Sequence, residues 1–306
     1  FFMGTTVVKL NKEKLKEVKQ YYKAYISSRK IPYAAFFAKK DGITITAYNS
    51  GKVMFQGDNE KQEALLWESM PTESTKKTAT LPAGFAQKSI IGSDEVGNGS
   101  YFGPLVVCAA YADKNHLDTL KKLGVKDSKM LDDKQILKLA PQLESSIPFQ
   151  KLVVTPKKYN QIQPRYNAVG MKVALHNQCI HLLLEKMSPQ KPEAILIDQF
   201  AQETTYRKYL KSEKNPITQN LYFITKGEQY HLAVAAASII CRAEFLNSLK
   251  QQSQEVGIEL PSGAGSQSDK QAAKIIKKGG IELLANYAKL HFKNTEKAQK
   301  IAQKQN

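Results

Sequence analysis

Residues 90–104 read IIGSDEVGNGSYFGP and place two adjacent acids, Asp94 and Glu95, at the end of an apolar run. A Gly-Asn-Gly turn at 97–99 follows almost at once. Neighbouring carboxylates raise one another's pKa unless a cation or solvent offsets their charge. The pattern therefore raises the question of what binds at the mouth of this turn.

The chain as a whole is long and basic. It has 306 residues, 42% of them hydrophobic, and this length favours two domains over a single core. The formal net charge is +17. Such a charge favours a polyanionic partner, most simply nucleic acid, and the alternative is that the lysines merely solvate the surface.

Cysteine usage and hydropathy restrict the cellular compartment and the kinds of site that the chain can carry. Three cysteines lie far apart without a C-x-x-C pair, which predicts a cytoplasmic protein without a disulfide or zinc site. The stretch HNQCIH (176–181) falls inside a helical pattern and has no partner motif, which favours structural roles. No run approaches the ~20 apolar residues of a membrane span. The first residues lack the features of a signal peptide, and Met3 is the expected biological start.

Residues 1–72 are predicted to form a small α+β domain. Apolar periodicity, the N-cap Asn11 and the hairpin turns at 41–42 and 49–51 mark its elements. The expected order is a strand (6–10), a helix (11–30), three strands (33–57) and a helix (59–70). Residues 73–88 are rich in Thr, Pro and Lys without an apolar period, which indicates a linker.

Residues 89–306 have the pattern of an α/β domain. Two strands flank the glycine turn as a hairpin, and we expect a mixed sheet flanked by helices. The other expected elements are helices near 132–145, 168–187 and 231–254, a short helix after 198, and strands at 149–155, 193–198 and 221–225. The lysine-rich end is predicted to be helical, and its last dozen residues are expected to fray.

Four acids stand at strand ends or strand–helix junctions of this domain: Asp94, Glu95, Asp198 and Glu228. A single such acid is usually a turn residue, but strand ends at one edge of an α/β sheet converge, and ligands gather there. Carboxylate oxygens suit Mg²⁺ or Mn²⁺. Two such ions ~3.5–4 Å apart can activate a water and stabilise the leaving oxygen of a phosphodiester. A basic protein with this site is predicted to be a nuclease.

The glycines after the acid pair allow another interpretation. Gly97, Gly99 and Gly103 loosely match a dinucleotide-binding or P-loop pattern. However, Pro104 and a β-rich run follow where a phosphate-binding helix would begin, and no Gly-Lys-Ser/Thr occurs. This interpretation is discounted.

Five motifs in this order resemble type 2 ribonuclease H, in particular its bacterial ribonuclease HIII branch, from residue 89 to about residue 290. They are DEVGNGSYFGPLVV (94–107), DSKML (127–131), AILID (194–198), KGE (226–228) and AVAAASIICR (233–242). The resemblance implies a ribonuclease H-like fold and a TBP-like N-terminal domain that helps to grip the substrate. Asn98 stands where the ribonuclease HII branch carries arginine.

The resemblance also implies an activity. Asp94, Glu95, Asp198 and Glu228 would be the catalytic and metal-binding residues, with Asp94 bridging two ions of Mg²⁺ or Mn²⁺. Glu228 would serve the ion that activates water, and Glu95 and Asp198 the other. The family cleaves the RNA strand of RNA/DNA hybrids, leaving a 3′-hydroxyl and a 5′-phosphate. The hybrid is the only expected partner of a monomer without membrane attachment.

Two rival functions can be stated. An inactive nucleic-acid-binding protein on the same fold would not need all four acids. A small-molecule phosphohydrolase would not need the basic N-terminal domain. An assay of hybrid cleavage with and without Mg²⁺ separates these alternatives.

Further residues are candidates for hybrid binding. The backbone amides of Gly97, Asn98 and Gly99 are expected to face ribose 2′-hydroxyls, which a plain β-turn would also allow. Lys129 could reach a phosphate or lie in a solvated loop. Lys172 and His176, with Asn177 on the same helical face, could contact substrate or pack against the protein.

Two other segments have similarly open assignments. The PSGAG loop (261–265) resembles a family loop near the substrate. Aromatic and basic residues of the N-terminal domain could form a hybrid-binding face, although aromatic residues of a small domain are usually core. They are Tyr21, Tyr22, Arg29, Lys30 and Phe37.

Overall fold

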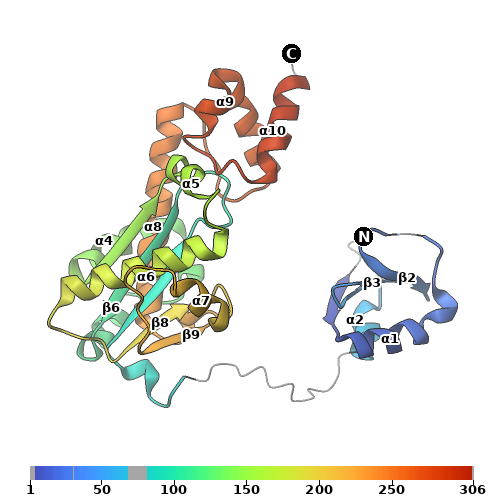
Figure 1. The fold of residues 1–306 in the computed structure, drawn as a ribbon, viewed down its shortest axis with the longest axis horizontal. Coiled ribbons are helices and arrows are strands. Elements are labelled where there is room, and N and C mark those ends of the chain that lie inside the picture. Colours follow the sequence, from blue (N-terminus) through green and yellow to red (C-terminus); the bar gives the residue numbers. More distant parts are fainter. Residues whose placement is uncertain (1–3, 30, 68–80, 305–306) are drawn as a thin grey trace. The chain divides into compact units, whose positions relative to one another are not determined.

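The computed structural model describes residues 4–29, 31–67 and 81–304 (Figure 1). The chain divides into two compact units, Phe1–Lys77 and Thr78–Asn306. Each unit has its own apolar core, and each is described by itself.

The first unit is an antiparallel sheet covered on one face by helices, as predicted. Its strand order is β1-β4-β3-β2. Val18 of α1 and Ala64 of α2 belong to the same apolar cluster as the inward side chains of the strands. The element bounds are β1 (Thr5–Lys9), α1 (Lys12–Tyr21), β2 (Ala34–Lys40), β3 (Ile43–Tyr48), β4 (Lys52–Gln56) and α2 (Glu60–Leu65).

Local signals in this unit act as expected at the start of the first helix, but both helices end earlier than predicted, the second at Leu65. The Asn11 side chain accepts a hydrogen bond from Lys14 N and begins α1. The first helix was predicted to run to residue 30, but it ends at Tyr21, because Tyr22 turns into the core and its hydroxyl donates to Glu63. Of the predicted helix at 59–70, the last three residues lie outside the described part of the chain.

The second unit is built on the predicted mixed sheet, in the order β7-β6-β5-β8-β9. The pairs β5–β6 and β6–β7 are antiparallel, whereas β5–β8 and β8–β9 are parallel. Helices lie on both faces of this sheet (Figure 1). The strand bounds are β5 (Ile90–Val96), β6 (Leu105–Ala112), β7 (Phe149–Val154), β8 (Ala194–Asp198) and β9 (Leu221–Ile224).

Alternating residues of the strands face two separate cores. On β6, Val106 and Cys108 pack with α8 and α4 in one cluster, whereas Val107 and Ala109 pack with α6 and α7 in the other. The helix bounds are α3 (Leu117–Lys122), α4 (Asp133–Ser146), α5 (Pro156–Ile162), α6 (Ala168–Met187), α7 (Glu203–Leu210), α8 (Leu232–Val256), α9 (Ser266–Leu284) and α10 (Lys293–Lys304).

Small side chains let α8 lie unusually close to β5. A Cβ added at Gly92 would lie 2.2 Å from the backbone nitrogen of Val234, so only glycine fits there. By length and composition α8 could cross a membrane, which corrects the expectation that no run reaches this length. About 67% of its most apolar window is buried inside the unit, as in a core helix.

His231 begins α8 and ties it to the segment before β5. Its Nδ1 accepts from Ala233 N, so its Nε2–H donates to the carbonyl of Lys88. Burial lowers the pKa of His231 to about 4, and the ring is neutral at physiological pH. Phe85 packs on this ring with only 3% of its surface exposed. Phe85 and the Lys88 carbonyl therefore attach the end of the predicted linker to the second unit, and residues 73–80 lie outside the described residues.

The end of the chain differs from the expectation of fraying. Helix α10 continues to Lys304 and buries Ala298 and Ala302 against the core. At its start the Asn294 side chain donates to the carbonyl of Ala264 and to Asp269. The expectation was wrong because the lysines of this helix lie on its outer face while a small-residue face is buried.

Candidate active site

Three parallel strands bring the predicted acids to one edge of the sheet. In the register of β5 and β8, Ser93 lies opposite Ile197, so Asp94 and Asp198 follow at the same level. Asp198 also pairs with the last residue of β9. Glu228 lies in the short 3₁₀ turn that follows β9.

Asp94 is the most buried member of the set after Glu228. Its Oδ1 accepts a hydrogen bond of 2.7 Å from Glu95 N. Burial raises the pKa of Asp94 to about 8, the charges of Asp198 and Glu95 add to the rise, and a hydrogen bond from Ser238 of α8 opposes it. Burial also raises the pKa of Asp198, whose Oδ1 accepts from Gly227 N across 2.9 Å.

Glu95 is held by two basic side chains of α6, Lys172 and His176. Lys172 Nζ lies 2.8 Å from its Oε1, and His176 Nε2 lies 3.0 Å from its Oε2. Burial alone would raise the pKa of Glu95, but His176 and Lys172 together hold it below its ordinary value. The ring of Phe200 lies 4.1 Å from Lys172 Nζ, where it excludes water from the ion pair.

Ser93 orients His176 from the strand. Its hydroxyl donates to the carbonyl of Cys108 at 3.1 Å and lies 2.7 Å from His176 Nδ1. The His176 ring is thus fixed at both nitrogens, by the Ser93 hydroxyl at Nδ1 and by the Glu95 carboxylate at Nε2. Sequence reasoning did not single out Ser93, although its position two residues before Glu95 places both on one face of the strand.

The candidate substrate-binding residues of α6 contact buried groups inside the protein. Lys172 is 6% exposed and His176 is fully buried, and both face Glu95. The amide of Asn177 bonds to the carbonyl of Asn215 and to Ile217 N, which fixes a loop. The two roles left open for this helix face were contact with substrate and packing inside the protein. The contacts of all three side chains lie inside the protein, and those of Lys172 and His176 are to Glu95.

Glu228 differs from the other acids because half of its carboxylate lacks a partner. Its Oε1 accepts from Lys129 Nζ at 2.9 Å, whereas its Oε2 is buried and has no hydrogen-bond partner among the described residues. The Lys129 side chain is 71% exposed. Lys226, two residues before Glu228, adopts the left-handed conformation with φ 61°, which is uncommon outside glycine and turns the chain toward the site.

The donor set fits a hard divalent cation. All four side chains offer carboxylate oxygens, the ligands that Mg²⁺ and Mn²⁺ prefer. A cation would satisfy Glu228 Oε2 and favour the ionised form of Asp94. Within the described residues no group of three or more His, Cys, Asp or Glu side chains is already arranged to hold a metal ion.

Comparisons with known proteins agree with this geometry. Residues 91–295 match the family Ribonuclease HII, and residues 5–80 match a domain of unknown function. The chain is 58% identical to ribonuclease HIII of Enterococcus faecalis over 299 residues, which cover 96% of this chain and 98% of the relative. It is 47% identical to ribonuclease HIII of Listeria monocytogenes over 308 residues, covering 99% and 100%.

The chain belongs to the type 2 ribonuclease H family, in its ribonuclease HIII branch. It is therefore a ribonuclease H, an endonuclease of the phosphodiester hydrolase class. The crystal structure of Bst-RNase HIII in complex with Mn²⁺ is similar, with a TM-score of 0.70 and 40% identity over 98% of this chain and all of that one. That complex supports the use of divalent metal in the branch.

The glycine turn of this ribonuclease H lies directly after the acid pair. Gly97 has φ 97°, and a Cβ there would lie 2.1 Å from the carbonyl oxygen of Pro104, so the fold itself requires glycine. Gly99 is different, because it has no positive φ, and no described atom outside its chain neighbours lies within 4 Å of an added Cβ. Its missing side chain instead leaves the backbone approachable from outside. Asn98, between them, is exposed.

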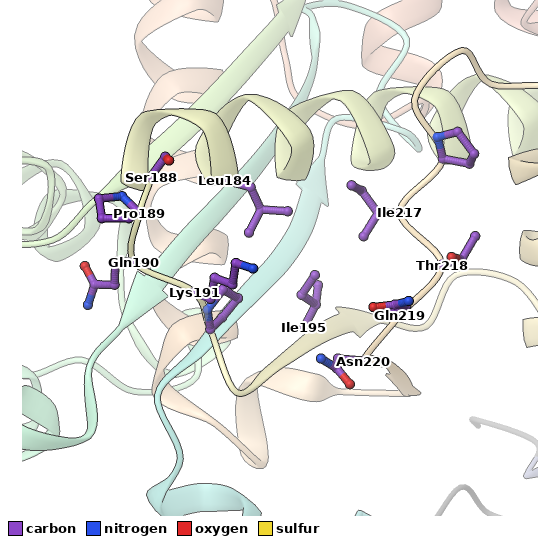
Figure 2. A pocket seen from close by; sticks show the side chains of 12 residues that line it. Leu184, Ser188, Pro189, Gln190, Lys191, Ile195, Ile217, Thr218, Gln219 and Asn220 are labelled. Atoms are coloured by element: carbon purple, nitrogen blue, oxygen red, sulfur yellow. The ribbon is translucent and has the colours of Figure 1, made fainter.

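A pocket of about 520 Å³ lies elsewhere in the ribonuclease H unit (Figure 2). It surrounds Ile195 at the start of β8, whereas Asp198 stands at the other end of that strand. None of its twelve described lining residues is acidic. The pocket is therefore separate from the candidate active site.

Proposed function

We propose that this ribonuclease H cleaves the RNA strand of RNA/DNA hybrids and leaves a 3′-hydroxyl and a 5′-phosphate. The ligands of two Mg²⁺ or Mn²⁺ ions would be Asp94, Glu95, Asp198 and Glu228. Bound there, the ions would supply an activated water and stabilise the leaving oxygen. The observation that carries the proposal is the convergence of four carboxylates on one sheet edge, where a buried oxygen of Glu228 has no hydrogen-bond partner in the described part of the chain.

The surrounding residues hold the acids in place before substrate arrives. Ser238 and the Glu95 amide hold Asp94, the Gly227 amide holds Asp198, and Lys172 with His176 holds Glu95. Prior orientation of this kind lowers the reorganisation needed in the transition state. Because Lys129 is exposed, its ammonium could leave Glu228 and contact a phosphate of the hybrid.

The glycine turn is the proposed reader of ribose. Its open side at Gly99 lets a sugar approach the backbone, and backbone amides can donate to 2′-hydroxyls. This hydroxyl is the group that distinguishes an RNA strand from a DNA strand. The turn lies directly after Asp94 and Glu95 in the chain, so ribose recognition and cleavage would occur side by side.

The first unit would add affinity through the open face of its sheet. Helices α1 and α2 cover one face. On the other face Val7, Met54, Thr46 and Phe37 form a row across the four strands by their register, in which Val7 is exposed, Met54 is half-buried, and Thr46 and Phe37 are buried. Exposed lysines flank this row. The lysines are Lys9, Lys39 and Lys52. Exposed lysines on one face of the sheet suit the phosphates of a nucleic-acid duplex.

A cleavage assay tests this proposal. A labelled RNA/DNA hybrid should be cut in Mg²⁺ or Mn²⁺ and left intact with EDTA, and a matched DNA duplex should be left intact in both. The products should carry 3′-hydroxyl ends that a polymerase extends without phosphatase treatment. Metal-independent cleavage, or ends that a polymerase extends only after dephosphorylation, would contradict the proposed chemistry.

A further inference from the structure

A fully buried lysine lies under the glycine turn and has no role in the chemistry described above. Lys289 follows α9 and has no exposed surface. Its Nζ donates to the carbonyl of Ser100 at 2.8 Å and to that of Gly103 at 2.7 Å. No described carboxylate pairs with it within the second unit, although the ring of Tyr159 lies 5.8 Å away.

The two carbonyls explain how this site tolerates a lysine. Burial lowers the pKa of Lys289 to about 7. A neutral amine has two N–H donors, which match the two carbonyls, and the charged form would add a third donor that faces Tyr159. In either form the side chain satisfies backbone oxygens that would otherwise be buried without partners.

The backbone beside Lys289 is attached to the same turn. Lys289 N donates to the carbonyl of Tyr101, and Gly103 N donates to the carbonyl of Tyr287. On the other side Tyr101 N donates to the carbonyl of Gly263. The 261–265 loop and residues 287–289 thus both bond to the base of the turn, whereas Asn98 and Gly99 at its tip are exposed.

We propose that Lys289 is a positioning residue for ribose recognition, which fixes the base of the glycine turn so that the amides at its tip face the RNA strand. Peptide groups are planar, so holding the carbonyl of Ser100 also fixes the direction of the Tyr101 N–H, and holding that of Gly103 fixes the peptide plane that leads into Pro104. A substitution without donors would release both peptide planes at once. The proposal rests on the proposed function of the turn.

The test combines protein variants with a scan of the substrate. In each hybrid of the series one ribonucleotide is replaced by its 2′-deoxy analogue, and kcat/KM is measured in Mg²⁺ for every position. In the wild-type protein, replacement at a ribose that the turn contacts should lower kcat/KM about 10-fold, the size of one or two lost hydrogen bonds. In Lys289→Met, a variant of similar length without donors, the same replacement should cost about 2-fold or less.

A matched control separates positioning from loss of stability. Lys278 of α9 also donates to a backbone carbonyl, that of Val256 at 2.7 Å, but its acceptor is the last residue of α8 and not a residue of the turn. Lys278→Met should keep the full penalty for the missing 2′-hydroxyl. Lys289→Gln, whose shorter amide retains two donors, should show an intermediate penalty. All variants are compared at a temperature at which circular dichroism shows each of them folded.

The outcomes are distinct. An unchanged 2′-deoxy penalty in Lys289→Met would overturn the proposal, because the lysine would then act on the fold alone. Failure of both Lys289 variants to fold would overturn it as well, since it would make Lys289 a residue of the core rather than of ribose recognition. If the wild-type protein cut no hybrid at all, the proposed function itself would be wrong.

Discussion

Asp94 and Glu95 are adjacent in the chain, yet they are held from opposite faces of the sheet. Ser238 of α8 bonds to Asp94, whereas Lys172 and His176 of α6 bond to Glu95. Successive residues of a strand point to opposite faces, so a pair of adjacent acids can be supported by two different helices. This arrangement explains how two adjacent carboxylates can stand together at the mouth of a turn.

The support of Glu95 can be tested with Lys172→Met. Loss of the ammonium leaves Glu95 less well oriented, and groups that orient metal ligands are typically worth about 10–100-fold in activity or metal affinity. We expect kcat to fall by this amount and more Mg²⁺ to be needed for half-maximal activity. Hybrid affinity, measured by fluorescence anisotropy in Ca²⁺, should change less than about 2-fold.

Lys129→Met is the matched comparison. In the wild-type protein Lys129 also pairs with an acid, Glu228, but the Lys129 side chain is 71% exposed. We expect its main effect on KM, because an exposed lysine is available to a phosphate. A rise in KM for Lys172→Met with kcat unchanged would show instead that Lys172 contacts the hybrid.

The raised pKa of Asp94 predicts a pH-dependent stability. The folded protein holds this pKa at about 8, above the ordinary value of 3.8, so ionisation of Asp94 destabilises the fold as pH rises from about 4 to 8. In EDTA, Asp94→Asn should therefore melt higher than the wild-type protein, by about 5 °C or more at pH 8.5. At pH 5 the difference should be small. Mn²⁺ should narrow the difference at pH 8.5, since a cation stabilises the ionised acid. Equal melting temperatures at both pH values would contradict this prediction.

The first unit is predicted to contribute binding rather than chemistry. Deletion of residues 1–77 should raise KM for the hybrid while leaving kcat within about 3-fold, because the four acids lie in the second unit. Lost phosphate contacts should also flatten the plot of log affinity against log salt. Substituting Lys9, Lys39 and Lys52 together by Gln should reproduce part of both effects. Equal affinity and equal salt slope in the truncated protein would show that this unit does not bind the hybrid.

Asn98 predicts a preference among substrates. Asparagine lacks the charge and the five donors of the arginine that the ribonuclease HII branch carries at this place. Recognition should then depend on successive 2′-hydroxyls, and we expect efficient cleavage within a run of ribonucleotides and poor cleavage at a single one. Side-by-side rates on duplexes with one and with four embedded ribonucleotides check this. Comparable rates on both would contradict it.

The sequence predicts the strands, the long helices and the edge at which the acids meet, because strand-end acids and apolar periodicity are local signals. It predicts α6 at 168–187 with the bounds that the structure has. It does not predict that Lys172 and His176 support Glu95, because this depends on which turn of α6 crosses β5. Lys289 carries no local signal at all, since its partners are two backbone carbonyls nearly two hundred residues earlier in the chain.

Loss of a single carboxylate charge tests the central claim most directly. Asp94→Asn and Glu228→Gln keep the shape of each side chain but remove an anionic ligand. We expect each to lower the rate of hybrid cleavage in Mg²⁺ by at least about 10³-fold, a loss of roughly 4 kcal/mol of transition-state stabilisation. Binding of the hybrid should stay within about 3-fold. Near-normal cleavage by either variant would contradict the assignment of these carboxylates to the metal site.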